Sequence, residues 1–145
     1  MIPRTTGFWP VLIQGVHGLE ARGTVAGMKH VRTTNKRGLF KPLIESAAVQ
    51  AATMVLRPGQ SSSDEVENEH PRSEQWMFVV WGSGRATVGK RSVKVAEGSL
   101  LLIDKGEAHR ITNTGRIEMV TVNFYAPPAY SGNGEVRRSV KRGKR

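Results

Sequence analysis

About seven short runs of apolar and β-branched residues, separated by glycine or polar turns, constrain the fold of this chain more than any other feature. In the first run Val49, Ala51, Thr53 and Val55 occupy alternate positions, which is the period of a β-strand. Helical periodicity is almost absent, and only 38–46 could form a short helix. Such a series predicts an antiparallel sandwich or barrel. We expect strands at 49–56, 76–81, 85–88, 92–95, 100–103, 109–112 and 117–125.

The length of 145 residues suits one domain with ends of a different character. Residues 1–27 contain five Gly and two Pro without periodicity, so we expect a weakly ordered extension there. Met28 follows directly, and we interpret it as the natural start; the alternative is an arm that exchanges with a partner subunit. We then expect an arm at 28–46 that includes the short helix, the domain at 47–130 and a disordered basic tail at 131–145.

The net charge of +10 is concentrated in the two ends of the chain. Residues 1–41 hold seven Lys or Arg and one acid, and residues 133–145 hold six and one. The remaining residues, 42–132, hold nine basic and ten acidic side chains and are nearly neutral. Basic clusters at chain ends are usually solvated tails, so we do not expect nucleic acid as a partner.

Cysteine is absent from the chain, which excludes disulfides, zinc ribbons and thiol nucleophiles. Any bound metal would therefore have nitrogen and oxygen ligands. The apolar stretch at 8–13 is far shorter than the roughly 18 residues of a membrane-spanning helix, and we expect no contact with a membrane. These features favour a cytoplasmic protein.

Residues 98–113 describe a strand, a tight turn and a second strand that begins at a histidine. Their anchors are Gly98, Asp104, Gly106, His109 and Asn113. This spacing resembles the second sequence motif of the cupin superfamily, with an aspartate where that motif has proline. Aspartate is itself a good turn former, so the turn should persist. The resemblance implies an all-β cupin double-stranded β-helix, a jelly-roll barrel.

The first cupin motif is matched less completely. His70 corresponds to the second histidine of that motif, Asn68 stands at its first histidine, and Gly82 matches its closing glycine. Counting back from Gly82 gives Gln75 at the acidic position, whereas the distance from His70 gives Glu74. Adjacent strand residues face opposite ways, so only one of these two side chains should face the site.

The resemblance implies a mononuclear metal site inside the barrel. Its ligands would be His70, His109 and either Gln75 or Glu74, with Asn68 as a fourth. Imidazole, amide and carboxylate donors suit a divalent ion such as Zn, Mn, Fe or Ni, and do not select one of them.

Each of these residues also has an ordinary structural interpretation. His109 could be a hydrogen-bonded core histidine, and His70 could be an exposed residue at a loop end. Glu74 could be an outward-facing acid, because the glycine spacing favours its neighbour. Asn68 could stabilise a loop through its own side chain.

The resemblance extends over about 47–128, and the segments 70–75 and 125–128 look like small cupins labelled mannose-6-phosphate-isomerase-like. We expect a small cupin that acts on an oxygen-rich molecule, a sugar derivative or oxo acid, in an isomerase-, epimerase- or dioxygenase-like reaction with Glu69 or Glu74 moving a proton. The alternative is a non-catalytic ligand-binding cupin. Trp76 and Trp81 offer apolar surface for a homodimer.

Overall fold

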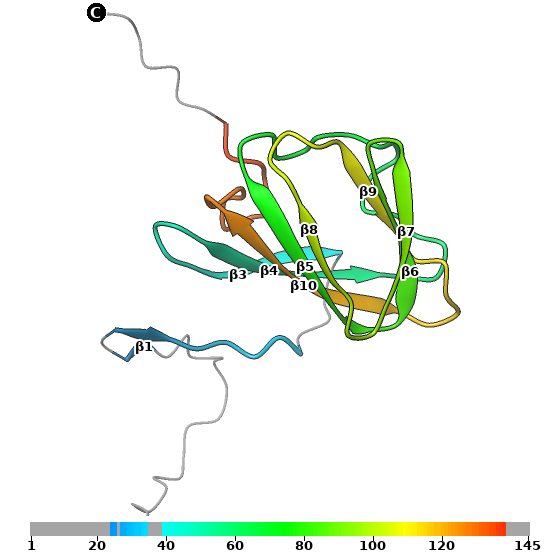
Figure 1. Ribbon diagram of the computed structural model, residues 1–145. Helices are drawn as coiled ribbons and strands as arrows, with labels where there is room; N and C mark the ends of the chain where they lie inside the picture. Colours follow the sequence, from blue (N-terminus) through cyan, green and yellow to red (C-terminus); the bar gives the residue numbers. More distant parts are fainter. Residues whose placement is uncertain (1–23, 26, 35–38, 139–145) are drawn as a thin grey trace, which may run out of the picture.

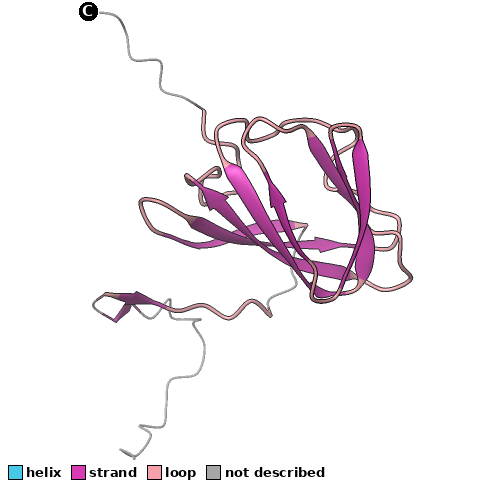
Figure 2. Ribbon diagram, in the orientation of Figure 1, coloured by secondary structure: helices cyan, strands magenta, loops and turns pink. Residues whose placement is uncertain are grey.

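The computed structural model describes residues 24–25, 27–34 and 39–138, and these form β-strands joined by turns and loops (Figure 1; Figure 2). Five strands build the larger sheet, in the order β3-β4-β10-β5-β8, and three build a second sheet, in the order β7-β6-β9. A two-stranded hairpin, β1-β2, lies upstream. The strands are β1 (Thr24–Val25), β2 (Met28–Lys29), β3 (Phe40–Glu45), β4 (Gln50–Leu56), β5 (Glu74–Trp81), β6 (Ser83–Val88), β7 (Arg91–Ala96), β8 (Leu100–Ile103), β9 (His109–Thr112) and β10 (Met119–Ala126).

The two larger sheets face one another and enclose an apolar core. All their strand pairs are antiparallel, and the non-sequential order of β10 between β4 and β5 gives the jelly-roll crossover. Both sheets supply inward side chains, which makes one continuous interior. The core residues are Met54, Leu56, Met77, Val79, Ala86, Val95, Ile103, Ile111 and Met119.

The seven expected strands are all present, as β4 to β10. On β5 the alternation is clear, because Met77 and Val79 are buried while Trp76, Phe78 and Val80 are exposed on the other face. This alternation gives β5 one face toward the interior and one apolar face toward solvent. The all-β cupin barrel predicted from the sequence is therefore confirmed.

The short helix expected at 38–46 is wrong, because β3 occupies this segment at the edge of the larger sheet. Pro42 is tolerated there, since an edge strand needs hydrogen bonds on one side only, and the register shifts between Pro42 and Ile44. All six residues of β3 are partly buried, so the strand lacks the alternation of a two-faced sheet.

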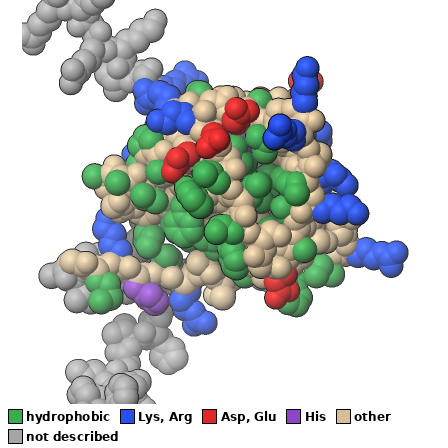
Figure 3. Space-filling model, viewed as in Figure 1, with side chains coloured by type: hydrophobic (Ala, Val, Ile, Leu, Met, Phe, Trp, Pro, Cys, Tyr) green, Lys and Arg blue, Asp and Glu red, His purple; other side chains and the backbone are tan. Residues whose placement is uncertain are grey.

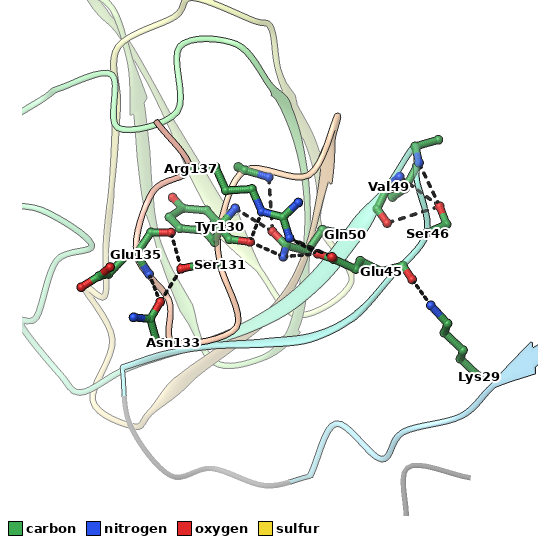
Figure 4. A network of polar contacts seen from close by, with 12 residues as sticks. Lys29, Glu45, Ser46, Val49, Gln50, Tyr130, Ser131, Asn133, Glu135 and Arg137 are labelled. Carbon is green, nitrogen blue, oxygen red and sulfur yellow. Dashed lines mark hydrogen bonds and ion pairs between the residues drawn. The ribbon is translucent and has the colours of Figure 1, made fainter. Parts of the chain in front are cut away.

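The tail expected to be disordered from residue 131 is ordered as far as Arg138, which corrects that prediction. Residues 127–138 fold back on β3 and β4, where the buried Gln50 side chain bonds the backbone of Tyr130 at both its N–H and its carbonyl (Figure 4). Arg137 pairs with Glu45 at 2.7 Å and also donates to the carbonyl of Tyr130. The last residues, 139–145, lie outside the described part.

The upstream extension expected at 1–27 lies outside the described residues, except for β1 and Gly27. Met28, interpreted as the natural start, lies in β2 and pairs with Val25, and its role as a start stays a prediction. Among the residues described here, no helix is long and apolar enough to cross a membrane.

Candidate metal centre and its cavity

The two motif histidines meet inside the barrel although 39 positions separate them in the chain. His70 lies in the loop before β5 and His109 begins β9, and their Nε2 atoms lie 3.1 Å apart. Both are buried, with 4% and 7% of their surface exposed. The other ring nitrogen of each faces a backbone carbonyl, Ser73 for His70 at 3.2 Å and Glu107 for His109 at 2.9 Å.

Gln75 completes this cluster from β5. Its Oε1 lies 3.0 Å from His70 Nε2, and its amide N–H donates to Asn123 Oδ1 on β10. Asn123 in turn donates to the hydroxyl of Thr121, and all three side chains are buried. Glu74 has the opposite orientation, because its carboxylate accepts a bond from the Trp76 indole on the outer face. Of the two candidates, the structure therefore brings Gln75 and not Glu74 to the histidines.

The hydrogen-bond roles in this cluster favour a cation between the donors. A neutral imidazole that donates from Nδ1 to a carbonyl has a lone pair at Nε2. With both Nδ1 atoms facing carbonyls, the two Nε2 lone pairs and the Gln75 oxygen converge without a proton to share. Burial lowers the pKa of His109, the bond to Glu107 opposes this effect, and the nearby His70 adds to it. The lowered pKa keeps the lone pair of His109 available.

The spacing of these donors suits a metal ion. Ligand atoms about 2.0–2.1 Å from a shared ion lie roughly 3 Å from one another. The Nε2 atom of His70 lies 3.1 Å from His109 Nε2 and 3.0 Å from the Gln75 oxygen. Within the described ranges no three His, Cys, Asp or Glu side chains form a cluster that could hold an ion. The third protein donor would therefore be the neutral amide of Gln75.

A cavity of about 400 Å³ opens beside the cluster. Two tyrosines form part of its wall, and the His70 ring meets Tyr125 edge to face with ring centres 4.9 Å apart. Burial is the main cause that raises the pKa of Tyr125 well above its ordinary value, and burial and the charge of Glu69 also raise the pKa of Tyr130. The apolar lining residues are Leu39, Phe40, Met54, Ile111 and Val136.

The acidic loop before β5 supplies the polar side of this cavity. Glu67 forms a β-bridge with His109, and both Glu67 and Glu69 line the cavity. Burial of the carboxyl and then the charge of Glu67 raise the pKa of Glu69, although that residue stands at the exposed rim. Asn68 lies between them and does not line the cavity, so the structure does not bring it to the histidines.

The remaining motif residues have structural roles. The turn at Asp104 is present, because its carbonyl accepts from Glu107 N–H and Gly106 has a φ of 87°, which glycine adopts without strain. Asn113 is fully buried and donates to the carbonyls of Leu56 and Ile117. These residues fix turns and loops of the barrel, and none of them lines the cavity.

Sequence reasoning missed Asn123, Tyr125 and Tyr130 as site residues. The first two face inward from β10, where Tyr125 pairs with Gln75 across the ladder. The alternation of β10 could have identified them once its register with β5 was known. Tyr130 follows the last strand and reaches the cavity because Gln50 fixes its backbone. No local sequence pattern predicts this contact, because the two residues are far apart in the chain.

Comparison with curated proteins finds two relatives from Streptomyces. Tetracenomycin polyketide synthase protein TcmJ of Streptomyces glaucescens is 24% identical over 121 residues, which cover 80% of this chain and 79% of the relative. Protein SchB of Streptomyces halstedii is 35% identical over 75 residues, or 52% of each chain.

Comparison with solved structures gives the same fold. A crystal structure from Bacillus halodurans has a TM-score of 0.62 and 26% identity, covering 72% of this chain and 81% of the other. A Cupin 2 conserved barrel domain protein from Salinispora arenicola has a TM-score of 0.56 and 15% identity over 68% and 88%. The family model described as Cupin domain matches residues 52–125, half of the chain, and the chain therefore belongs to the cupin family.

Proposed function

We propose that this cupin binds a divalent metal at His70, His109 and Gln75 and holds an oxygen-rich small molecule in the adjoining cavity. The observation that carries the proposal is the approach of two buried imidazole nitrogens to 3.1 Å beside a cavity of about 400 Å³. The site is fixed before any ligand arrives, because each ring is held by a backbone carbonyl and Gln75 is held by Asn123.

The lining of the cavity favours one of the two expected ligand classes. Five apolar side chains and two tyrosines face a few polar groups, which suits a molecule with an apolar body and carbonyl or enol oxygens. An oxo compound fits this surface better than a bare sugar, whose hydroxyls would lie against apolar walls. The similarity to TcmJ, a tetracenomycin polyketide synthase protein, supports an oxo compound as the ligand.

The side chains that line the cavity would have different chemical roles toward a bound ligand. A bound divalent ion would polarise a ligand oxygen that reaches it. Tyr125 and Tyr130 keep their phenolic protons through neutral pH and can donate hydrogen bonds to ligand oxygens. Glu69, at the rim, is the group we assign to proton transfer at carbon or oxygen, and the outward orientation of Glu74 removes it from that role.

Metal analysis of the protein as isolated tests the site. We expect about one divalent ion per chain in the native protein, and loss of that ion in His109→Ala. His30→Ala is the matched control, because His30 is an exposed histidine on the upstream arm. Equal metal content in the native protein and both variants would reject the proposed ligands.

An assay for substrate conversion distinguishes an enzyme from the alternative, a non-catalytic ligand-binding cupin. A panel of oxo acids, polycarbonyl compounds and keto sugars is incubated with metal-loaded protein in air and without oxygen. Conversion that disappears in His109→Ala and falls in Glu69→Gln would support the enzyme. Tight binding without conversion in either atmosphere would support the binding module.

We also propose that two copies associate through the outer face of β5 and β8. On this face Trp76 lies opposite Leu102 and Phe78 opposite Leu100, and all four side chains are 39–63% exposed. β8 is an edge strand with no neighbour on its outer side among the described strands, so this side could extend the sheet. Figure 3 shows apolar side chains across the middle of the view.

The absence of cysteine favours a reducing compartment, and we propose the cytoplasm.

A further inference from the structure

A second hollow region lies outside the barrel, on the other side of His70. Two adjoining hollows of about 300 and 620 Å³ share the side chains of Arg72, Pro127, Pro128, Arg137 and Arg138 in their walls. Lys29 from β2 lines the larger one. We call this region, defined by Lys29, Arg72, Arg137, Arg138 and the two prolines, the basic groove.

The basic groove carries an excess of positive charge. Four cationic side chains line it, and Glu45 is the one carboxylate among its lining residues, which leaves a formal net charge of +3. Glu45 is already bound to Arg137, in what is the only ion pair among the described residues. Arg72 and Arg138 therefore have no acidic partner in the described part of the chain, and both are exposed to solvent.

The arrangement of the groove is fixed by the contacts beneath it. Arg137 is held by the Glu45 carboxylate and by the carbonyl of Tyr130, and Lys29 donates to the Glu45 carbonyl (Figure 4). Arg72 is two residues from His70, whose ring bonds the Ser73 carbonyl. These cations come from three separate segments of the chain, which distinguishes the groove from a simple run of basic residues.

We propose that the basic groove binds the phosphate group of a small phosphate ester. A phosphomonoester carries a charge of about −1.5 to −2 at neutral pH, which matches a net charge of +3 better than a single carboxylate does. Arginine forks bind phosphate oxygens in pairs, and two arginines here are without acidic partners. Pro127 and Pro128 offer an apolar wall to the organic part of the ester.

Charge distribution argues for a small ester and against a nucleic acid. A duplex presents a row of phosphates and needs an extended basic surface. Residues 42–132, which form most of the barrel, hold nine basic and ten acidic side chains, so the barrel itself does not carry a net positive charge that could follow a duplex. The inference rests on the groove alone and does not require the proposed metal site, although the groove and the cavity share His70 and Val136.

Calorimetric titration of the full chain with phenyl phosphate tests the proposal. The protein is first treated with a chelator that is then removed, because phosphate also binds divalent metals. We expect Arg72→Gln and Arg138→Gln each to weaken binding about tenfold, the effect of losing a charge-assisted hydrogen bond. Arg116→Gln is the matched control, since it removes the same charge from an exposed loop outside the groove and should leave the affinity within twofold.

Three outcomes determine whether the groove is the site. In His109→Ala we expect unchanged affinity for phenyl phosphate, and a loss there would overturn the proposal by placing the phosphate in the cavity. If Arg116→Gln weakened binding equally, the binding would be nonspecific electrostatic attraction, and this result would also overturn the proposal. Short duplex DNA that binds more tightly than phenyl phosphate and depends equally on Arg72 would assign the groove to nucleic acid instead.

Discussion

Gln75→Glu is the substitution that most directly tests the chemistry of the cluster. The native Gln75 amide makes two contacts. Its oxygen faces His70 Nε2 at 3.0 Å, and its nitrogen donates to Asn123 Oδ1 at 2.9 Å. A carboxylate at this position has nearly the same shape but cannot donate. In the arrangement seen here it would place two acceptor oxygens against each other. If Asn123 rotated to donate instead, the variant would still bury a negative charge at a residue with 3% of its surface exposed.

Two opposite effects follow from this change. Without metal, either the unpaired Asn123 oxygen or the buried carboxylate charge costs about 1–3 kcal/mol of folding free energy. A domain of this size loses roughly 4–8 °C of melting temperature per kcal/mol. With metal, a charged ligand replaces a neutral one, and we expect at least about tenfold tighter binding, or ~1.4 kcal/mol of extra stabilisation at saturation.

Thermal unfolding at pH 8, with a chelator and with excess Mn²⁺ or Zn²⁺, measures both effects in the same protein. The variant should melt below the native protein with chelator and should gain more from the metal. Glu74→Gln is the control, because that neighbour faces outward and bonds Trp76. If Gln75→Glu and Glu74→Gln respond to the metal alike, or if the chelated Gln75→Glu protein is as stable as the native one, the assigned role of Gln75 is wrong.

Three other predictions concern stability and assembly. The pKa values of Tyr125 and Tyr130 are raised in the folded protein. Their contribution to stability is therefore fully present below the ordinary tyrosine pKa of about 10 and is lost as the pH rises above that value. These are the two tyrosines of the chain, so phenolate absorbance should appear only with alkaline unfolding; a titration near pH 10 in folded protein would contradict this. Gln50→Leu should cost about 2–4 kcal/mol in urea unfolding, because it leaves the buried backbone N–H groups of Ala129 and Tyr130 unpaired. Phe78→Lys should convert a dimer to a monomer in light scattering, whereas a native protein that is already monomeric would reject the interface.

The fold was predictable because most strands have one face toward the core. The strand period along 49–56 corresponds to β4, and the glycine turns correspond to tight connections of the barrel. The inward face of β4 is the other alternate set, Gln50, Ala52, Met54 and Leu56. β3 was missed for the converse reason, since its residues are all partly buried and Pro42 interrupts the pattern. Its strand conformation depends on pairing with β4, which is a long-range contact, and local propensity does not record it.

The histidines of the site were predictable because each stands at a fixed distance from a turn. The choice between Gln75 and Glu74 was not, since both lie at the start of β5 and only the phase of the strand decides which faces inward. That phase is set by the pairing of Gln75 with Tyr125 on β10 and Ile103 on β8. The basic groove was hidden for a similar reason, because its cations come from segments far apart in the chain.

An amide in place of the family carboxylate gives this cluster a property that glutamate could not supply. In the arrangement seen here, donation runs from Gln75 to Asn123 and from Asn123 to Thr121, which leaves the Gln75 oxygen facing His70, where it could bind the proposed ion. The same three side chains can also be bonded in the opposite direction, because a threonine hydroxyl donates as well as accepts and an amide presents either end after rotation. In that direction the Gln75 nitrogen would donate to His70, so the buried imidazole would have a partner without a metal. His70 would thus have a partner both with and without the proposed ion, and we expect reversible metal binding that costs the barrel little stability when the ion leaves.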